Sequence, residues 1–171
     1  MEQKKGTKQK ILDKARTLFN ELGYNSVSLR DIAKAAGISE GNLTYYFQKK
    51  VNLMEELHAS GEDTFPAAPP QTLEELDAMF LDMQQTVQKN LYFFMHYTQL
   101  SQISPKISQM QRARCREMVE KLSFALQSLQ DAGLLRGEEF PAEYENIVDT
   151  LYLSILYWAP FAELRKDAGA N

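Results

Sequence analysis

Apolar residues recur at helical spacing along the whole chain of 171 residues. No stretch alternates apolar and polar residues over a sustained run, which is the pattern of a half-buried strand, and no repeat of fixed period is present. The spacing therefore predicts an all-α fold. A chain of this length can build a sizeable core but is short for two large independent domains.

Three helices are predicted in the first fifty residues. A helix over about Thr7–Leu22 has one apolar stripe, and Gly23 is placed to end it as a left-handed cap. Ser28 is predicted to cap a second helix that Gly37 ends, and Ser39 is predicted to cap a short third helix. Two short helices joined by a glycine-containing turn, preceded by a longer helix, form a helix-turn-helix arrangement.

The remaining chain predicts a linker and a helical bundle. Three prolines between residues 65 and 70 cannot continue a helix and mark a boundary. Helices are expected over about Lys50–Ser60, from a Thr72 cap to Gln88, and over Leu91–Ile103, Pro105–Ala132 and Ala142–Lys166. We therefore assign a helix-turn-helix domain to residues 1–50, a connecting helix with a proline-rich linker to 51–70, and a helical bundle to 71–171.

Charge is distributed unevenly between these parts. Residues 1–50 carry ten Lys and Arg against five Asp and Glu, a net charge of +5, whereas the remaining 121 residues carry nine against 18, a net charge of −9. This charge distribution predicts that the basic N-terminal part binds a polyanion, and that the acidic remainder is repelled from the polyanion and faces a different partner.

Several classes of protein are excluded by what the sequence lacks. It contains no nucleophile elbow, paired-histidine metal motif or Walker loop, so we expect neither an enzyme nor a bound metal or cofactor. The apolar stretch Thr150–Ala162 is shorter than the roughly 20 residues that a membrane span needs. Cys115 is the only cysteine and no secretory signal is evident, so we expect a cytoplasmic protein without disulfides or membrane contact.

One known family shows the same residues at the same spacing. The matching residues are Leu18-Phe19, Gly23-Tyr24, the stretch from Val27 to Leu43, Tyr46-Phe47 and Lys50. Over about residues 7–57 the chain resembles the DNA-binding domain of the TetR family of transcriptional regulators. The resemblance implies a homodimer that binds a double-stranded DNA operator with one recognition helix per half-site. It also implies a C-terminal helical domain for dimerisation and ligand binding.

Two residues at the start of the second helix are predicted to face DNA. Ser28, as the N-cap, leaves helix N–H groups where a phosphate can sit, and the resemblance gives it the same role. Arg30 has a forked guanidinium that can pair with a guanine edge. A solvated arginine that pairs with Asp31 or with phosphate fits the same position, so both interpretations of Arg30 stay open.

The third helix is predicted to be the recognition helix, which enters the major groove and turns Leu43 and Phe47 inward. Gly41 permits a close approach to the DNA. Asn42 can reach adenine or a phosphate, and the Tyr45 ring can lie on a thymine methyl group. These residues are predicted to contact the operator.

Four further residues complete the predicted DNA-binding set. The resemblance implies that Tyr46 and Lys50 hold phosphates. Thr44 departs from the family pattern, which often has Tyr there, and Glu40 places a negative charge where many members have a longer polar or basic residue. Glu40 can accept a hydrogen bond from a cytosine amino group or complement the positive helix N-terminus, and we favour the second.

The body of the chain suggests a ligand cavity and a dimer interface. Aromatic and Met residues either form plain core or line an apolar cavity: Met79, Phe80, Met83, Phe93, Phe94, Tyr97, Phe124 and Trp158. The last helix is apolar almost all round, so both of its faces must be covered. A second copy of the chain is the simplest cover, through Leu153, Leu156, Tyr157 and Pro160.

The sequence as a whole favours a dimeric DNA-binding transcriptional regulator, a repressor that a small apolar or amphipathic ligand releases from its operator. Two alternatives stay open. One is a helical protein-interaction module that keeps the helix-turn-helix as a scaffold, and the other is a DNA-binding regulator that has no small-molecule ligand.

Overall fold

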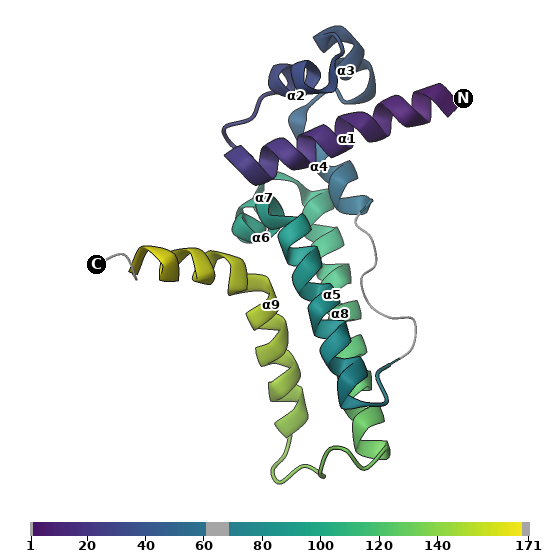
Figure 1. The fold of residues 1–171 in the computed structure, drawn as a ribbon, viewed down its shortest axis with the longest axis vertical. Helices are drawn as coiled ribbons and strands as arrows, with labels where there is room; N and C mark the ends of the chain where they lie inside the picture. The colour runs from purple at the N-terminus through teal and green to yellow at the C-terminus, as the bar shows by residue number, and fades with distance from the viewer. Residues whose placement is uncertain (1, 61–68, 169–171) are drawn as a thin grey trace. The chain divides into compact units, whose positions relative to one another are not determined.

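The structure is a computed structural model that describes residues 2–60 and 69–168, so most of the predicted proline-rich linker lies outside the described residues. Every regular element in the described residues is a helix, which confirms the all-α prediction (Figure 1). The chain divides into two compact units. Within the described residues, the first unit contains 2–60 and 96–110, and the second contains 69–95 and 111–168.

The first unit is built on a long N-terminal helix. Helix α1 packs against α2 and α4, and α2 packs against α3. Ile11, Ala15 and Phe19 of the predicted α1 stripe are fully buried, and burial of each large apolar side chain contributes about 1.5–3 kcal/mol. The unit contains α1 (Glu2–Leu22), α2 (Leu29–Ala36), α3 (Glu40–Tyr46), α4 (Lys50–Ala59), α7 (Tyr97–Ile103) and the first residues of α8 (Pro105–Asp131).

The second unit is built from α5 (Leu73–Lys89), α6 (Leu91–Met95), the rest of α8, and α9 (Glu143–Ala168). Helix α9 lies against α5 and α6. It also bends along its length (Figure 1) and contains Pro160, which has no N–H to donate to the preceding turn. The buried apolar side chains of this unit include Met79, Met83, Val87, Phe93, Leu129, Val148, Tyr152 and Leu156.

The prediction of a single helix over residues 91–103 is wrong. The segment forms two helices, α6 and α7, separated by His96, whose φ of −122° and ψ of 23° lie outside the helical region. The His96 carbonyl accepts the N–H of Leu100 at 2.9 Å and so begins a new helix. As a result Phe93 belongs to the second unit and Tyr97 to the first. Apolar spacing alone does not reveal a one-residue break of this kind.

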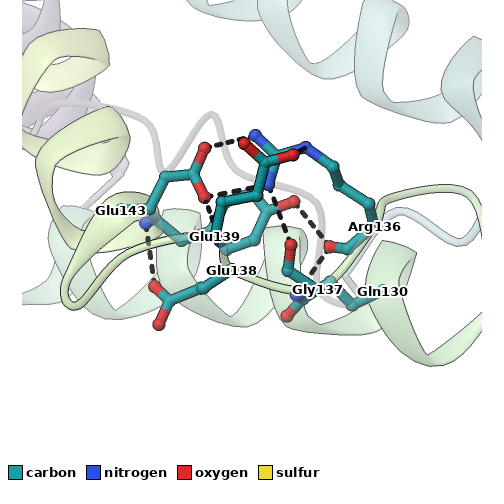
Figure 2. A network of polar contacts seen from close by, with 7 residues as sticks. Gln130, Arg136, Gly137, Glu138, Glu139 and Glu143 are labelled. Atoms are coloured by element: carbon teal, nitrogen blue, oxygen red, sulfur yellow. Dashed lines mark hydrogen bonds and ion pairs between the residues drawn. The ribbon is translucent and has the colours of Figure 1, made fainter.

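The connection between α8 and α9 is held by a polar network (Figure 2). The Arg136 guanidinium donates to both carboxylate oxygens of Glu143, one of them at 2.9 Å. The same carboxylate accepts the backbone N–H of Glu139 at 2.8 Å. The Arg136 carbonyl accepts from the Gln130 amide at 3.0 Å and from the Tyr144 hydroxyl at 2.8 Å. Because the Arg–carboxylate pair is bidentate, it fixes orientation as well as distance.

This network predicts an acid-sensitive contribution to stability. Hydrogen bonds from Arg136 and from the Glu139 backbone lower the pKa of Glu143 from 4.5 to about 2. A lowered carboxyl pKa stabilises the fold in full above the ordinary Glu value, and that contribution is lost as the pH falls toward 2. Glu143→Gln should therefore reduce the free energy of unfolding at neutral pH, and the difference from the unaltered protein should shrink below about pH 4.

Urea denaturation at a series of pH values measures this difference. Glu145→Gln, at an exposed position in the same first turn of α9, is the matched control and should change stability little. A pH-independent difference between Glu143→Gln and the unaltered protein would contradict the account.

Candidate nucleic-acid interface

The start of α2 is held by a reciprocal capping arrangement. The Ser28 hydroxyl oxygen accepts the N–H of Asp31 at 3.2 Å, and the Asp31 carboxylate accepts the backbone N–H of Ser28 at 2.9 Å. The Ser28 hydroxyl also donates to that carboxylate at 2.5 Å, and this hydrogen bond is the main cause of the lowered pKa of Asp31. The cap therefore occupies Ser28 itself, and the N–H groups of Leu29 and Arg30 have no partner among the described residues.

The turn between α2 and α3 depends on one glycine. Gly37 has a φ of +65°, a left-handed conformation that costs glycine little and other residues more. Its N–H donates to the Lys34 carbonyl at 3.1 Å, and the N–H of Ile38 donates to the Ala33 carbonyl at 3.0 Å, which together close the end of α2. Ser39 then caps α3 by accepting the N–H of Asn42 at 3.2 Å. The predicted caps and the predicted turn are confirmed.

Helix α3 divides into a buried face and an exposed face. Leu43 and, just beyond the helix, Phe47 are buried in the first unit, as predicted. Tyr45 is 68% exposed as a residue, and its ring meets the Tyr46 ring edge-on, with centroids 5.3 Å apart. The Thr44 hydroxyl donates to the carbonyls of its own helix, at 3.1 and 3.0 Å. Thr44 therefore satisfies its polar group within α3.

Glu40, Gly41 and Asn42 form the exposed first turn of α3. A Cβ atom placed on Gly41 would meet no atom within 4 Å, so the packing of the chain itself does not require glycine there. This leaves room for close approach of a docked partner. Glu40 lies where its carboxylate complements the positive end of the helix.

Arg30 is exposed in the first turn of α2, and its guanidinium forms no hydrogen bond or ion pair with the described part of the chain. The Asp31 carboxylate accepts hydrogen bonds from Ser28, and the positive charge of Arg30 also helps to lower the pKa of Asp31. Both interpretations of Arg30 therefore stay open. An exposed guanidinium is able to read a base edge.

Lys50, the first residue of α4, is turned toward the α1–α2 turn. Its Nζ donates to the carbonyl oxygens of Tyr24 at 2.7 Å and Val27 at 2.8 Å, and it lies 4.2 Å from the centroid of the Tyr24 ring. Burial lowers the pKa of the Lys50 ammonium. Two of its three N–H groups therefore donate hydrogen bonds within the first unit.

A second candidate site is an apolar groove between α5 and α9 of the second unit. Its volume is about 270 Å³, and its lining consists of Phe80, Met83, Gln84, Val87, Leu151, Ser154, Ile155 and Trp158. Each helix contributes four residues at the spacing i, i+3, i+4 and i+7, which places them on one face. This spacing can be read from the sequence. It could have identified the five lining residues that the sequence analysis did not name.

The other predicted cavity residues lie elsewhere. Met79 and Phe93 are buried in the core, and Phe94 is half-buried on α6. Tyr97 belongs to α7 in the first unit, and Phe124 is 61% exposed on α8. Phe80, Met83 and Trp158 are the predicted residues that line the groove.

Helix α9 also carries an exposed apolar face. Leu153, Tyr157, Phe161 and Leu164 follow one another by four, four and three positions, and between 45% and 69% of each residue is exposed. We name these four residues the α9 open face. Of the other residues predicted for the dimer interface, Leu156 is only 8% exposed because it packs inside its own unit, and Pro160 is half-buried.

Metal and membrane sites are not found in the described residues. No cluster of three or more His, Cys, Asp or Glu side chains is arranged to hold a metal ion there. None of the described helices combines the length and the apolar character that crossing a bilayer requires.

A capped pair of short helices, an exposed first turn on the second of them and an outward arginine define a DNA-binding protein of the helix-turn-helix class. Comparison with known families gives the particular family. The family model described as "Bacterial regulatory proteins, tetR family" matches residues 11–57, and the TetR model described as "Bacterial transcriptional repressor" matches residues 51–171. The chain belongs to the TetR family, as its sequence indicated.

Individual relatives agree with this assignment. The HTH-type transcriptional regulator AcrR of Shigella flexneri is 27% identical over 146 residues, which cover 77% of this chain and 68% of that protein. Other curated regulators match across only 26% of their own length. The matched families and relatives are transcriptional regulators, so the chain is a DNA-binding regulator and not an enzyme.

Solved structures share the fold. A TetR-family transcriptional regulator from Marinobacter aquaeolei VT8 superposes with a TM-score of 0.85 at 23% identity, covering 92% of this chain and 80% of that chain. The SmeT–triclosan complex superposes with a TM-score of 0.64 at 21% identity, covering 95% of this chain and 83% of SmeT.

Proposed function

We propose that this chain is a dimeric repressor that acts in the cytoplasm and leaves its operator when a small apolar or amphipathic molecule binds the groove between α5 and α9. The observation that carries the DNA-binding part is the exposure of both the first turn of α3 and Arg30 in the first turn of α2. The TetR model that spans residues 51–171 is described as a transcriptional repressor, which supports repression.

Dimerisation is supported by the α9 open face. Four large apolar side chains exposed in a row on one helix are unusual on a monomer surface and typical of an interface. A two-fold dimer presents two copies of α3, so the operator is expected to contain two half-sites related by dyad symmetry. Their centres should lie about 34 Å or a multiple of it apart.

Ligand control is supported by the chemistry of the groove. Its lining is apolar apart from Gln84 and Ser154 and contains no charged residue, so it fits a neutral molecule with an apolar body and few hydrogen-bonding groups. The triclosan complex of SmeT is a precedent for such a ligand on this fold. Release from DNA requires that the ligand bind the DNA-free form more tightly than the DNA-bound form.

Selection of duplexes from a randomised pool tests DNA recognition. The unaltered protein should enrich a dyad-symmetric sequence, and its affinity should fall steeply with salt. Arg30→Ala should relax the preference at one base position in each half-site, at a cost of about 1–3 kcal/mol. Lys34→Ala, at an exposed position of the same helix, is the control and should keep the sequence preference. An unchanged preference in Arg30→Ala would show that Arg30 reads no base.

Thermal unfolding with a panel of neutral apolar compounds tests the groove. A ligand at 100 times its dissociation constant should add about 2.7 kcal/mol of stability. Gln84→Trp, which fills the groove, should abolish that stabilisation. Gln85→Trp places the same side chain at the neighbouring exposed position outside the lining and should keep it. Equal stabilisation of both variants would place the ligand elsewhere.

A further inference from the structure

The ammonium group of Lys50 connects two segments that are far apart in sequence. It lies at the start of α4, and its two carbonyl partners lie 26 and 23 residues earlier, in the turn between α1 and α2. Both hydrogen bonds are short and partly buried, at 2.7 Å to Tyr24 and 2.8 Å to Val27. Lys50 therefore ties the first turn of α4 to this turn.

The positive charge of Lys50 is stabilised inside the protein by two backbone carbonyl dipoles and an aromatic ring. No Asp or Glu among the described residues pairs with it. The two carbonyl oxygens and the face of the Tyr24 ring, 4.2 Å from Nζ, surround the ammonium instead. Hydrogen bonds with a charged donor are roughly twice as strong as neutral ones, so these contacts hold the turn firmly.

The turn that Lys50 holds leads directly into the DNA-facing end of α2. Tyr24 is anchored against Phe19, with ring centroids 5.4 Å apart, and Val27 is buried. The next residue after Val27 is Ser28, the N-cap of α2, and Arg30 follows in the first turn. The position of the Val27 carbonyl therefore sets where α2 begins and where Arg30 is placed relative to α3.

We propose that Lys50 is a positioning residue for operator binding: it holds the α1–α2 turn, and through it the start of α2 and Arg30, in the geometry that matches DNA, and does not act by neutralising a phosphate. This inference rests on the proposed function, because it concerns affinity for an operator. It replaces the phosphate contact that the resemblance implied for Lys50.

The dependence of affinity on salt separates the two roles. A lysine that neutralises a phosphate releases counterions, so its removal reduces the slope of log affinity against log salt by about 0.9. A lysine that only positions other groups leaves the number of neutralised phosphates unchanged. Its removal lowers affinity by the same factor at every salt concentration.

The experiment compares Lys50→Met with the unaltered protein on the duplex that the unaltered protein enriches from a randomised pool. We expect a loss of roughly tenfold or more, the scale of a lost hydrogen bond to a charged group, with an unchanged salt slope. Amide hydrogen exchange at the start of α2 should become faster. Lys49→Met removes the same charge from the adjacent exposed position and should leave exchange at the start of α2 unchanged.

Two results would overturn the proposal. A salt slope reduced by about 0.9 in folded Lys50→Met would identify a phosphate contact. Unchanged affinity in the folded variant would show that Lys50 contributes only to the stability of the fold.

A second variant keeps the test decisive if Lys50→Met does not fold. Lys50→Arg retains the charge, but its larger planar group does not match two carbonyls and a ring arranged around an ammonium. Our proposal expects lower affinity and faster exchange, whereas equal affinity with unchanged exchange would overturn it. If the unaltered protein enriches no duplex, the proposed function fails, and the exchange measurement still tests whether Lys50 holds the turn.

Discussion

Replacing Phe19 with alanine is expected to reduce the free energy of unfolding of the first unit by about 3–5 kcal/mol. The Phe19 side chain is fully buried at the C-terminal end of the α1 stripe and contacts the Tyr24 ring. Its removal leaves a cavity under the turn that carries α2, and the surrounding helices can close it only in part. DNA binding should be lost at temperatures where this unit no longer folds.

Urea denaturation followed by circular dichroism measures this effect. Leu22→Ala removes an apolar side chain from the same helix at a position that is 57% exposed, and it should change stability by no more than about 0.5 kcal/mol. Similar effects for the two variants would mean that the α1 stripe does not form the core of the first unit.

Replacing Leu153 with glutamate is expected to produce monomers and to lower operator affinity by about 10²–10⁴. Leu153 is 56% exposed in the α9 open face, and a carboxylate there would be buried without a partner when two copies meet. In a monomer, each recognition helix binds its half-site alone. The gain in operator affinity that comes from joining two DNA-binding units in one dimer is then lost.

Analytical ultracentrifugation at micromolar concentration, together with titration of the selected duplex, measures both effects. Leu81→Glu is the matched control, because it makes the same change at a similarly exposed position on α5, outside the α9 open face. A Leu153→Glu variant that stays dimeric would place the dimer interface on another surface.

The helix-turn-helix was predictable because its signals are local. Ser28 and Asp31 are three residues apart and complete a cap between them, and Gly37 ends α2 through hydrogen bonds to residues within the preceding turn. Such contacts form within one segment of chain, so the residue types at fixed short spacing are enough to identify them.

The groove was only partly predictable. The sequence indicated aromatic and Met residues but not which helices face each other, and α5 and α9 are separated by more than fifty residues of chain. Phe80 and Trp158 share the groove because their helices pack together, whereas Phe124, chemically similar, is left exposed on α8.

The amino-acid sequence by itself determined the helical class of this protein, the caps of its DNA-reading helices and its family, since each depends on residues close together in the chain. Only the tertiary structure decided the break at His96, the partners of Lys50 and the side of α9 that stays open. Those features arise where distant segments meet, and contacts between distant segments are set by the packing of the whole unit.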